Sequence, residues 1–254
     1  SAALLPQLEE LGKRFSSLSR IILCGMGGSS LGPEVISKTF KKDIFIFDST
    51  DPNYAAHALD GDLSKTLVIV SSKSGSTIET ASQRALLEEQ IKKAGLNPID
   101  HFLFITDPGS PLDIDVRAQG FTVINADPHV GGRFSVLGAF GLVPSALSGS
   151  PVKTLLDDSR IEKESFIADA QPVLDTAYLL ATQSAQYIGF TDAQSEMPGL
   201  SDWIEQLIAE STGKNSVGRL PIATESATNA ATGGGFTVSF AGTETDLIVE
   251  GALG

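Results

Sequence analysis

Short apolar runs that alternate with helix-like segments fill the first half of the chain and constrain its fold more than any other feature. The runs lie at residues 21–24, 44–47, 66–70, 101–106 and 121–124. Each is apolar along its length rather than alternately apolar and polar, which indicates strands that are buried on both faces. Strands of this kind, separated by helices, predict an α/β fold with a doubly wound parallel sheet.

The helices of this fold are expected at residues 33–40, 54–59 and 77–93. The pattern changes after Pro144, and residues 147–151 are typical of a hinge. We therefore place a first domain, with an N-terminal helix, at residues 1–150 and a second domain at 151–254. The second domain is expected to be helical over residues 154–187 and 200–210, with a loop over 223–235 and strands at 236–240 and 246–249. No internal repeat is visible in the sequence.

The composition excludes several classes of protein. The chain has 31 Asp and Glu against 18 Lys and Arg, for a net charge of −13, which argues against a nucleic-acid-binding protein. No stretch approaches the roughly 20 apolar residues that cross a bilayer, and the N-terminus lacks the features of a signal peptide. We therefore expect a cytoplasmic protein without a membrane partner. The single cysteine, Cys24, cannot form an internal disulfide, and its place after an apolar run predicts a buried thiol.

The first motif is a glycine-rich turn, GMGGSSLG, at residues 25–32 between a strand and a helix. Glycines allow the backbone to approach a ligand closely, and a helix N-terminus offers free N–H groups to an anion. Asp48 ends the next strand, where a ribose-binding acid lies in dinucleotide sites, but Ser30 replaces the third glycine of that pattern. This motif alone leaves a nucleotide site, a sugar-phosphate site and a structural turn equally open.

The second motif is SSKSGST at residues 71–77, between a strand and the helix that contains Glu79. Its five hydroxyls and one ammonium can surround a phosphate, and the helix dipole favours the negative charge. A helix cap needs only one such side chain, so the sequence favours phosphate binding. The order of residues differs from that of a P-loop, which argues against a nucleoside triphosphate.

Two further motifs contain charged residues. In GGRFS, at residues 131–135, Arg133 follows paired glycines and can stabilise an oxyanion, although a surface arginine is equally open. Gln206 and Glu210 lie four residues apart and share a helix face. A carboxylate such as Glu210 at a helix end can act as a general base, although the spacing alone favours an exposed helix acid.

Together and in this order, the four motifs resemble those of glucose-6-phosphate isomerases, over roughly residues 20–254. The details look most like actinobacterial enzymes and the isomerase part of transaldolase–isomerase fusions. The resemblance implies a sugar-isomerase (SIS) domain with a flavodoxin-like, three-layer αβα architecture, followed by an incomplete second SIS domain. It also implies a homodimer, no metal and no cofactor.

The resemblance further implies interconversion of glucose 6-phosphate and fructose 6-phosphate through an enediolate. Glu210 would then be the base that moves a proton between C1 and C2, and Arg133 would stabilise the developing oxyanion. The positions implied in substrate binding are Ser72, Lys73, Ser74 and Thr77 for the phosphate, Gly28 and Ser29 along the sugar, and Gln206.

The chain also departs from the family pattern. The family commonly has Thr-Phe-Thr-Thr at residues 74–77 and Asp in place of Ser30, and its ring-opening histidine and late lysine lie beyond Gly254. The histidines of this chain, His57, His101 and His129, do not match that position. We therefore expect a central fragment that binds substrate but turns it over poorly or not at all. The alternatives are a non-catalytic SIS module that binds a phosphosugar and, with less support, a dinucleotide-binding domain.

Overall fold

The computed structural model describes residues 2–215, 217–226, 228–229 and 234–240. The chain divides into two compact units, Ser1–Val152 and Lys153–Gly254. Each unit has its own sheet.

The first unit is built on a five-stranded parallel sheet in the order β2-β1-β3-β4-β5. The strands are β1 (Arg20–Cys24), β2 (Phe45–Phe47), β3 (Thr66–Ser71), β4 (Phe102–Thr106) and β5 (Thr122–Asn125). All six residues of β3 and all five of β4 are buried, as expected for central strands covered on both faces. This strand order is that of flavodoxin-like folds, and it confirms the predicted doubly wound α/β fold.

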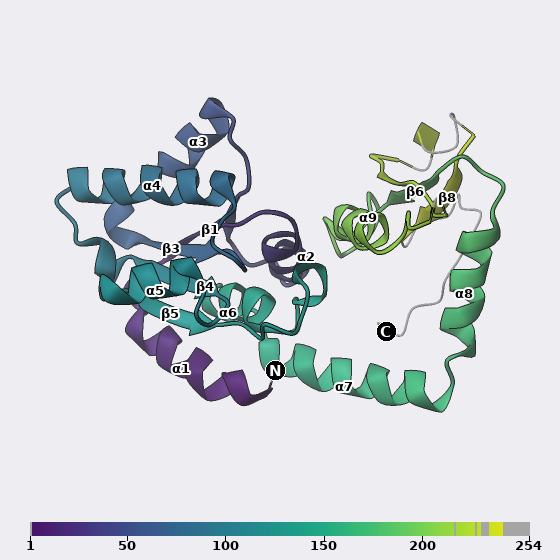
Figure 1. The fold of residues 1–254 in the computed structure, drawn as a ribbon, viewed down its shortest axis with the longest axis horizontal. Coiled ribbons are helices and arrows are strands. Elements are labelled where there is room, and N and C mark those ends of the chain that lie inside the picture. The colour runs from purple at the N-terminus through teal and green to yellow at the C-terminus, as the bar shows by residue number, and fades with distance from the viewer. Residues whose placement is uncertain (1, 216, 227, 230–233, 241–254) are drawn as a thin grey trace. The chain divides into compact units, whose positions relative to one another are not determined.

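Helices cover both faces of this sheet (Figure 1). On one face, α3 (Pro52–Leu59), α4 (Ile78–Lys93) and α5 (Pro111–Ala118) enclose a core that includes Phe47, Phe102 and Phe104. On the other face, α6 (Ala139–Leu147) contacts both α1 (Leu5–Arg14) and α2 (Leu31–Thr39). The result is the three-layer αβα arrangement that the sequence predicts.

The helix boundaries follow local capping. The helix expected from residue 54 begins at Pro52, because Asp51 accepts hydrogen bonds from the amides of Asn53 and Tyr54. Helix α5 was missed in the sequence. Ser110 caps it by accepting a hydrogen bond from the Asp113 amide at 3.0 Å, and Pro111 occupies its first turn, where a missing N–H costs nothing.

Cys24 lies at the end of β1 and is fully buried, as predicted. Burial raises the pKa of its thiol, so this side chain packs as a small apolar group and is not a reactive nucleophile.

The second unit begins with two helices, α7 (Val152–Ala168) and α8 (Gln171–Thr182), and not with one helical segment. Asp169 accepts a hydrogen bond from the Gln171 amide at the break, and α8 ends at Thr182 rather than at residue 187. The expected second helix is present as α9 (Leu200–Ser211), and the expected strand at 236–240 is β8 (Phe236–Ser239). The strand expected at residues 246–249 lies outside the described residues.

Two strands of the second unit were missed in the sequence, β6 (Ile188–Thr191) and β7 (Pro221–Ala223). Both are short, and β6 contains only two large apolar side chains. Its four residues are nevertheless buried, because β6 is the central strand of a parallel sheet in the order β7-β6-β8.

The second unit repeats the topology that begins the first. In both, a central strand is followed by a helix (α9 or α2), and the next two strands pair with its two sides. The repeat escapes sequence inspection because the loops differ. A glycine-rich turn follows β1, whereas Asp192 follows β6 and accepts a hydrogen bond from the Ser201 amide at 2.9 Å. A carboxylate of the chain itself therefore occupies the N-terminus of α9.

Within the described part of the chain, no helix combines the length and the apolar character that crossing a membrane requires.

Candidate active site

The carboxyl ends of β1 and β3 form the topological switch point of the first sheet, because the chain leaves these neighbouring strands toward opposite faces. Ligands of open α/β sheets bind at this edge. The glycine-rich turn follows β1 here, and the hydroxyl-rich loop follows β3. The fold therefore brings the first two sequence motifs to one edge.

The glycine-rich turn contacts the arginine turn. A Cβ on Gly28 would lie 2.5 Å from the carbonyl oxygen of Gly132 and 2.8 Å from the backbone nitrogen of Arg133. Only glycine allows this approach, because the atoms it meets are backbone atoms that cannot move away cheaply. The third motif is thereby held beside the first.

The hydroxyl-rich loop, residues 72–77, forms hydrogen bonds within itself. Ser72 Oγ accepts one from the Gly75 amide at 3.1 Å, and the hydroxyls of Ser74 and Ser76 lie 2.6 Å apart. Thr77 is the N-cap residue of α4, but its side chain makes no cap hydrogen bond. The loop thus presents hydroxyls at the N-terminus of a 16-residue helix, an arrangement suited to binding an anion.

Lys73 supplies the cation of this loop. Its Nζ lies 2.7 Å from Asp107 Oδ2 and 3.2 Å from the carbonyl oxygen of Pro128. The carbonyl oxygen of Lys73 accepts hydrogen bonds from the Asp107 amide at 3.0 Å and from Thr106 Oγ1 at 3.1 Å. The residue is therefore held at its backbone and at its ammonium.

Gly75 determines the shape of the loop. Its φ is +74°, and a Cβ there would lie 2.3 Å from Leu112 Cβ at the start of α5. Both the backbone conformation and the contact require glycine. The phenylalanine common in the family cannot be accommodated at this position with the same loop conformation.

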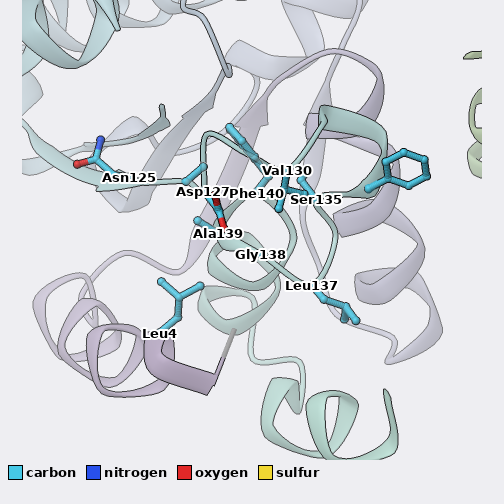
Figure 2. A pocket seen from close by; sticks show the side chains of 11 residues that line it. Leu4, Asn125, Asp127, Val130, Ser135, Leu137, Gly138, Ala139 and Phe140 are labelled. Atoms are coloured by element: carbon cyan, nitrogen blue, oxygen red, sulfur yellow. The ribbon is translucent and has the colours of Figure 1, made fainter. Parts of the chain in front are cut away.

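Arg133 lies in the turn Gly132–Phe134, with its guanidinium 4.6 Å from the centre of the Phe134 ring. A cavity of about 410 Å³ adjoins this turn and is lined by Phe134 and Ser135, among others. In Figure 2, Leu4 approaches the cavity from the N-terminal helix, across from Gly138 and Ala139. Its lining includes none of the four predicted phosphate ligands, so the proposed phosphate position lies outside this cavity.

The fourth motif lies on α9 in the second unit. Gln206 Nε2 donates a hydrogen bond to Glu210 Oε1 at 2.9 Å, so the two side chains share a helix face, as their spacing predicts. Glu210 is exposed and Gln206 is partly buried. Glu205 accepts a hydrogen bond from the Ala223 amide, which ties α9 to β7. Glu210 therefore lies on a helix that is anchored to its own sheet.

The three histidines and Asp48 lie in different environments. His101 is buried, with Nδ1 2.9 Å from the carbonyl oxygen of Thr66, while His57 and His129 are exposed. Burial, followed by the nearby Glu34 carboxylate, raises the pKa of Asp48. The described residues contain no group of three or more His, Cys, Asp or Glu that could hold a metal.

Asp107 is the polar neighbour of the hydroxyl-rich loop that the sequence analysis missed. It follows directly after β4, an apolar strand, as Asp48 follows β2. A polar residue in that position at the carboxyl edge of a parallel sheet is the signal that could have identified it.

The model of the phosphoglucose isomerase family matches residues 8–238. A glucose-6-phosphate isomerase from Campylobacter jejuni is 34% identical over 219 residues, covering 81% of this chain and 54% of the relative. One from Cyanothece is 37% identical over 214 residues, covering 76% and 40%. The crystal structure of a glucose-6-phosphate isomerase from Chlamydia trachomatis superposes with a TM-score of 0.75 at 25% identity, covering 89% and 48%.

The chain spans about half the length of these curated relatives. The family model nevertheless extends across both units, from α1 to β8. On this match, together with the relatives above 30% identity, the chain belongs to the phosphoglucose isomerase family.

Proposed function

We propose that this chain is part of an aldose–ketose isomerase that interconverts glucose 6-phosphate and fructose 6-phosphate. The observation that carries the proposal is the convergence of the hydroxyl-rich loop, the glycine-rich turn and the arginine turn within one unit of a member of this family. Phosphosugar isomerisation needs an anion site and a cation near a developing oxyanion, and these loops contain candidates for both.

Ser72, Lys73, Ser74 and Thr77 would bind the substrate phosphate. The supporting contacts are the compact loop, the helix N-terminus behind it and the fixed ammonium of Lys73. Hydroxyls and N–H groups at a helix N-terminus are the donors that a phosphate requires. Gly28 and Ser29 would lie along the sugar; the supporting observation is that Gly28 lies against the backbone of Gly132, which excludes a side chain at position 28.

Glu210 would remove the proton from one carbon of the substrate and return it to the next. A carboxylate can carry out this transfer when it is positioned against the substrate. The enediolate that forms would be stabilised by the guanidinium of Arg133. Gln206 would contact the substrate and orient Glu210 through their hydrogen bond.

Homodimer assembly and a cytoplasmic location belong to the same proposal; the first rests on the family resemblance and the second on the prediction from the sequence. Sedimentation of the purified chain over a concentration series tests the first. A single species with the mass of one chain at every concentration would contradict it.

Enzyme assay and ligand protection of the purified chain test the function. We expect glucose 6-phosphate to form from fructose 6-phosphate, and fructose 6-phosphate, but not fructose or NAD, to raise the unfolding temperature. Ligand at a hundredfold excess over its Kd adds about 2.7 kcal/mol to the free energy of unfolding. Protection by NAD alone would refute the proposal in favour of a dinucleotide site.

A phosphosugar-binding module without catalysis is the second candidate function. The observation that favours it is that the chain spans only about half the length of its relatives. Residues outside this chain can contribute to the active site of the whole enzyme. Protection by fructose 6-phosphate without any isomerisation would support this candidate.

A further inference from the structure

We propose that Asp107 is a positioning residue that presents the Lys73 ammonium to the phosphate of the substrate. This inference rests on the proposed function, because it assumes that the loop after β3 binds phosphate. It assigns a role to the loop after β4, which none of the four sequence motifs includes.

The arrangement follows from the order of the strands. β3, β4 and β5 are adjacent and parallel, so their carboxyl ends lie side by side. Lys73, Asp107 and Pro128 each lie just beyond one of these ends. The Lys73 ammonium bridges all three loops, contacting Asp107 Oδ2 at 2.7 Å and the Pro128 carbonyl oxygen at 3.2 Å.

The β4 loop holds Lys73 at two separate points. The Asp107 amide donates a hydrogen bond to the Lys73 carbonyl oxygen, while the Asp107 carboxylate contacts the ammonium. One residue therefore fixes both the backbone and the tip of a side chain with four rotatable bonds. A free lysine side chain loses considerable rotamer freedom when it is immobilised, and a lysine that is already held loses less when ligand binds.

The ammonium retains a donor for a ligand. A lysine ammonium has three N–H donors, and within the described residues the Lys73 ammonium contacts Asp107 and Pro128. The Lys73 side chain is 33% exposed and that of Asp107 19%. An external phosphate oxygen can thus reach Nζ without displacing either contact.

Electrostatics alone do not explain the presence of this acid. A carboxylate beside an anion site repels phosphate and so weakens the attraction of Lys73. Asp107 Oδ1 is also buried and has no hydrogen-bond partner among the described residues, which is costly for a carboxylate oxygen. An acid with both disadvantages is explained if its other oxygen orients Lys73 for the ligand.

Substitutions separate orientation from charge. Asp107→Asn removes the charge but keeps an oxygen that can accept a hydrogen bond from Lys73, whereas Asp107→Ala removes both. Asp115→Ala is the matched control, because Asp115 lies on α5, its carboxylate pairs with Arg84 of α4 at 3.2 Å, and its side chain is 55% exposed. Each variant is made in the full chain, with circular dichroism as the check of folding.

The readouts are KM and kcat for fructose 6-phosphate and the Kd of inorganic phosphate. We expect Asp107→Ala to raise KM and Kd about tenfold with kcat within about twofold. Asp107→Asn should stay within about threefold, and Asp115→Ala should have no effect. In a Lys73→Ala background, Asp107→Ala should cause no further loss, because its effect passes through Lys73.

Unchanged KM and Kd in Asp107→Ala would overturn the inference. Lower KM and Kd would overturn it too, because they would show that Asp107 only competes with the ligand. An equal loss in the Lys73→Ala background would overturn it as well. Phosphate binding without isomerisation by the unchanged chain would refute only the catalytic proposal, since the Kd series still tests Asp107. Binding of neither ligand by the unchanged chain would refute the proposed function and this inference together.

Discussion

Replacing Gly75 by alanine should strongly disturb the hydroxyl-rich loop, for two separable reasons. Its φ of +74° lies in the left-handed region, which costs an alanine about 1–2 kcal/mol. The added Cβ would also lie 2.3 Å from Leu112 Cβ and 3.3 Å from the Leu112 backbone. Overpacking of this kind costs about 1–3 kcal/mol, so the free energy of unfolding should fall by about 2–5 kcal/mol in total.

Gly95 provides a matched control for this substitution. Its φ is +75°, almost the same as that of Gly75, but nothing lies within 4 Å of a Cβ built on it. Gly95→Ala should therefore cost only the conformational term of about 1–2 kcal/mol. The difference between the two variants isolates the contact with Leu112.

Urea unfolding followed by circular dichroism measures both variants. Midpoints that fall while the slope stays constant report a change in stability alone. Inorganic phosphate binding provides the functional readout, and we expect it to weaken in Gly75→Ala and to persist in Gly95→Ala. Equal destabilisation by the two substitutions would refute the close approach of Gly75 to Leu112, and with it the described conformation of the hydroxyl-rich loop.

Three further substitutions test other parts of the structure. Gly28→Ala should lower the free energy of unfolding by about 1–3 kcal/mol and weaken fructose 6-phosphate binding, because its Cβ would meet the backbone of Gly132. Gly132→Ala is the control, because a Cβ there meets nothing within 4 Å, and equal binding by the two variants would contradict the contact between Gly28 and Gly132. Gly12 lies inside α1, and a Cβ built on it meets nothing within 4 Å. Gly12→Ala should therefore raise the free energy of unfolding by about 0.5–1 kcal/mol and the thermal midpoint with it, whereas a lower midpoint would contradict the placement of Gly12 inside a helix. Burial alone raises the pKa of Asp113, but the Gly109 amide, Arg117 and Asn125 together hold it below its ordinary value. Its stabilising contribution is therefore present above the unfolded pKa near 3.9 and is lost as pH falls through the lower folded pKa, so Asp113→Asn should destabilise the chain at neutral pH and flatten its acid unfolding curve; an unchanged curve would contradict this network.

The first sheet could be predicted because its strands lie in continuous apolar runs separated by helix-like segments. Residues 66–70 and 101–106 need no tertiary information to be identified as buried strands, and the structure places β3 and β4 there. The strand β6 could not be found this way, because Ile188 and Phe190 alone do not form a recognisable run. It is buried by pairing with β7 and β8, which lie far along the chain.

The candidate site was predictable in its residue types but not in its contacts. The hydroxyl-rich loop is visible as a cluster in the sequence, and the shared face of Gln206 and Glu210 follows from helical spacing. The contact between Gly28 and Gly132 joins segments about a hundred residues apart, and the ion pair between Lys73 and Asp107 depends on the order of strands in the sheet. No local pattern contains that order.

Proton exchange tests the central claim most directly. Fructose 6-phosphate is incubated with the purified chain in D₂O, and proton NMR follows deuterium incorporation at C1 and the appearance of glucose 6-phosphate. We expect exchange with the unchanged chain, none with Glu210→Gln, and persistent exchange with Glu205→Gln, which keeps an acceptor for the Ala223 amide. Exchange that persists in Glu210→Gln, or its absence in the unchanged chain while fructose 6-phosphate still binds, would contradict the claim that this chain transfers the proton through Glu210.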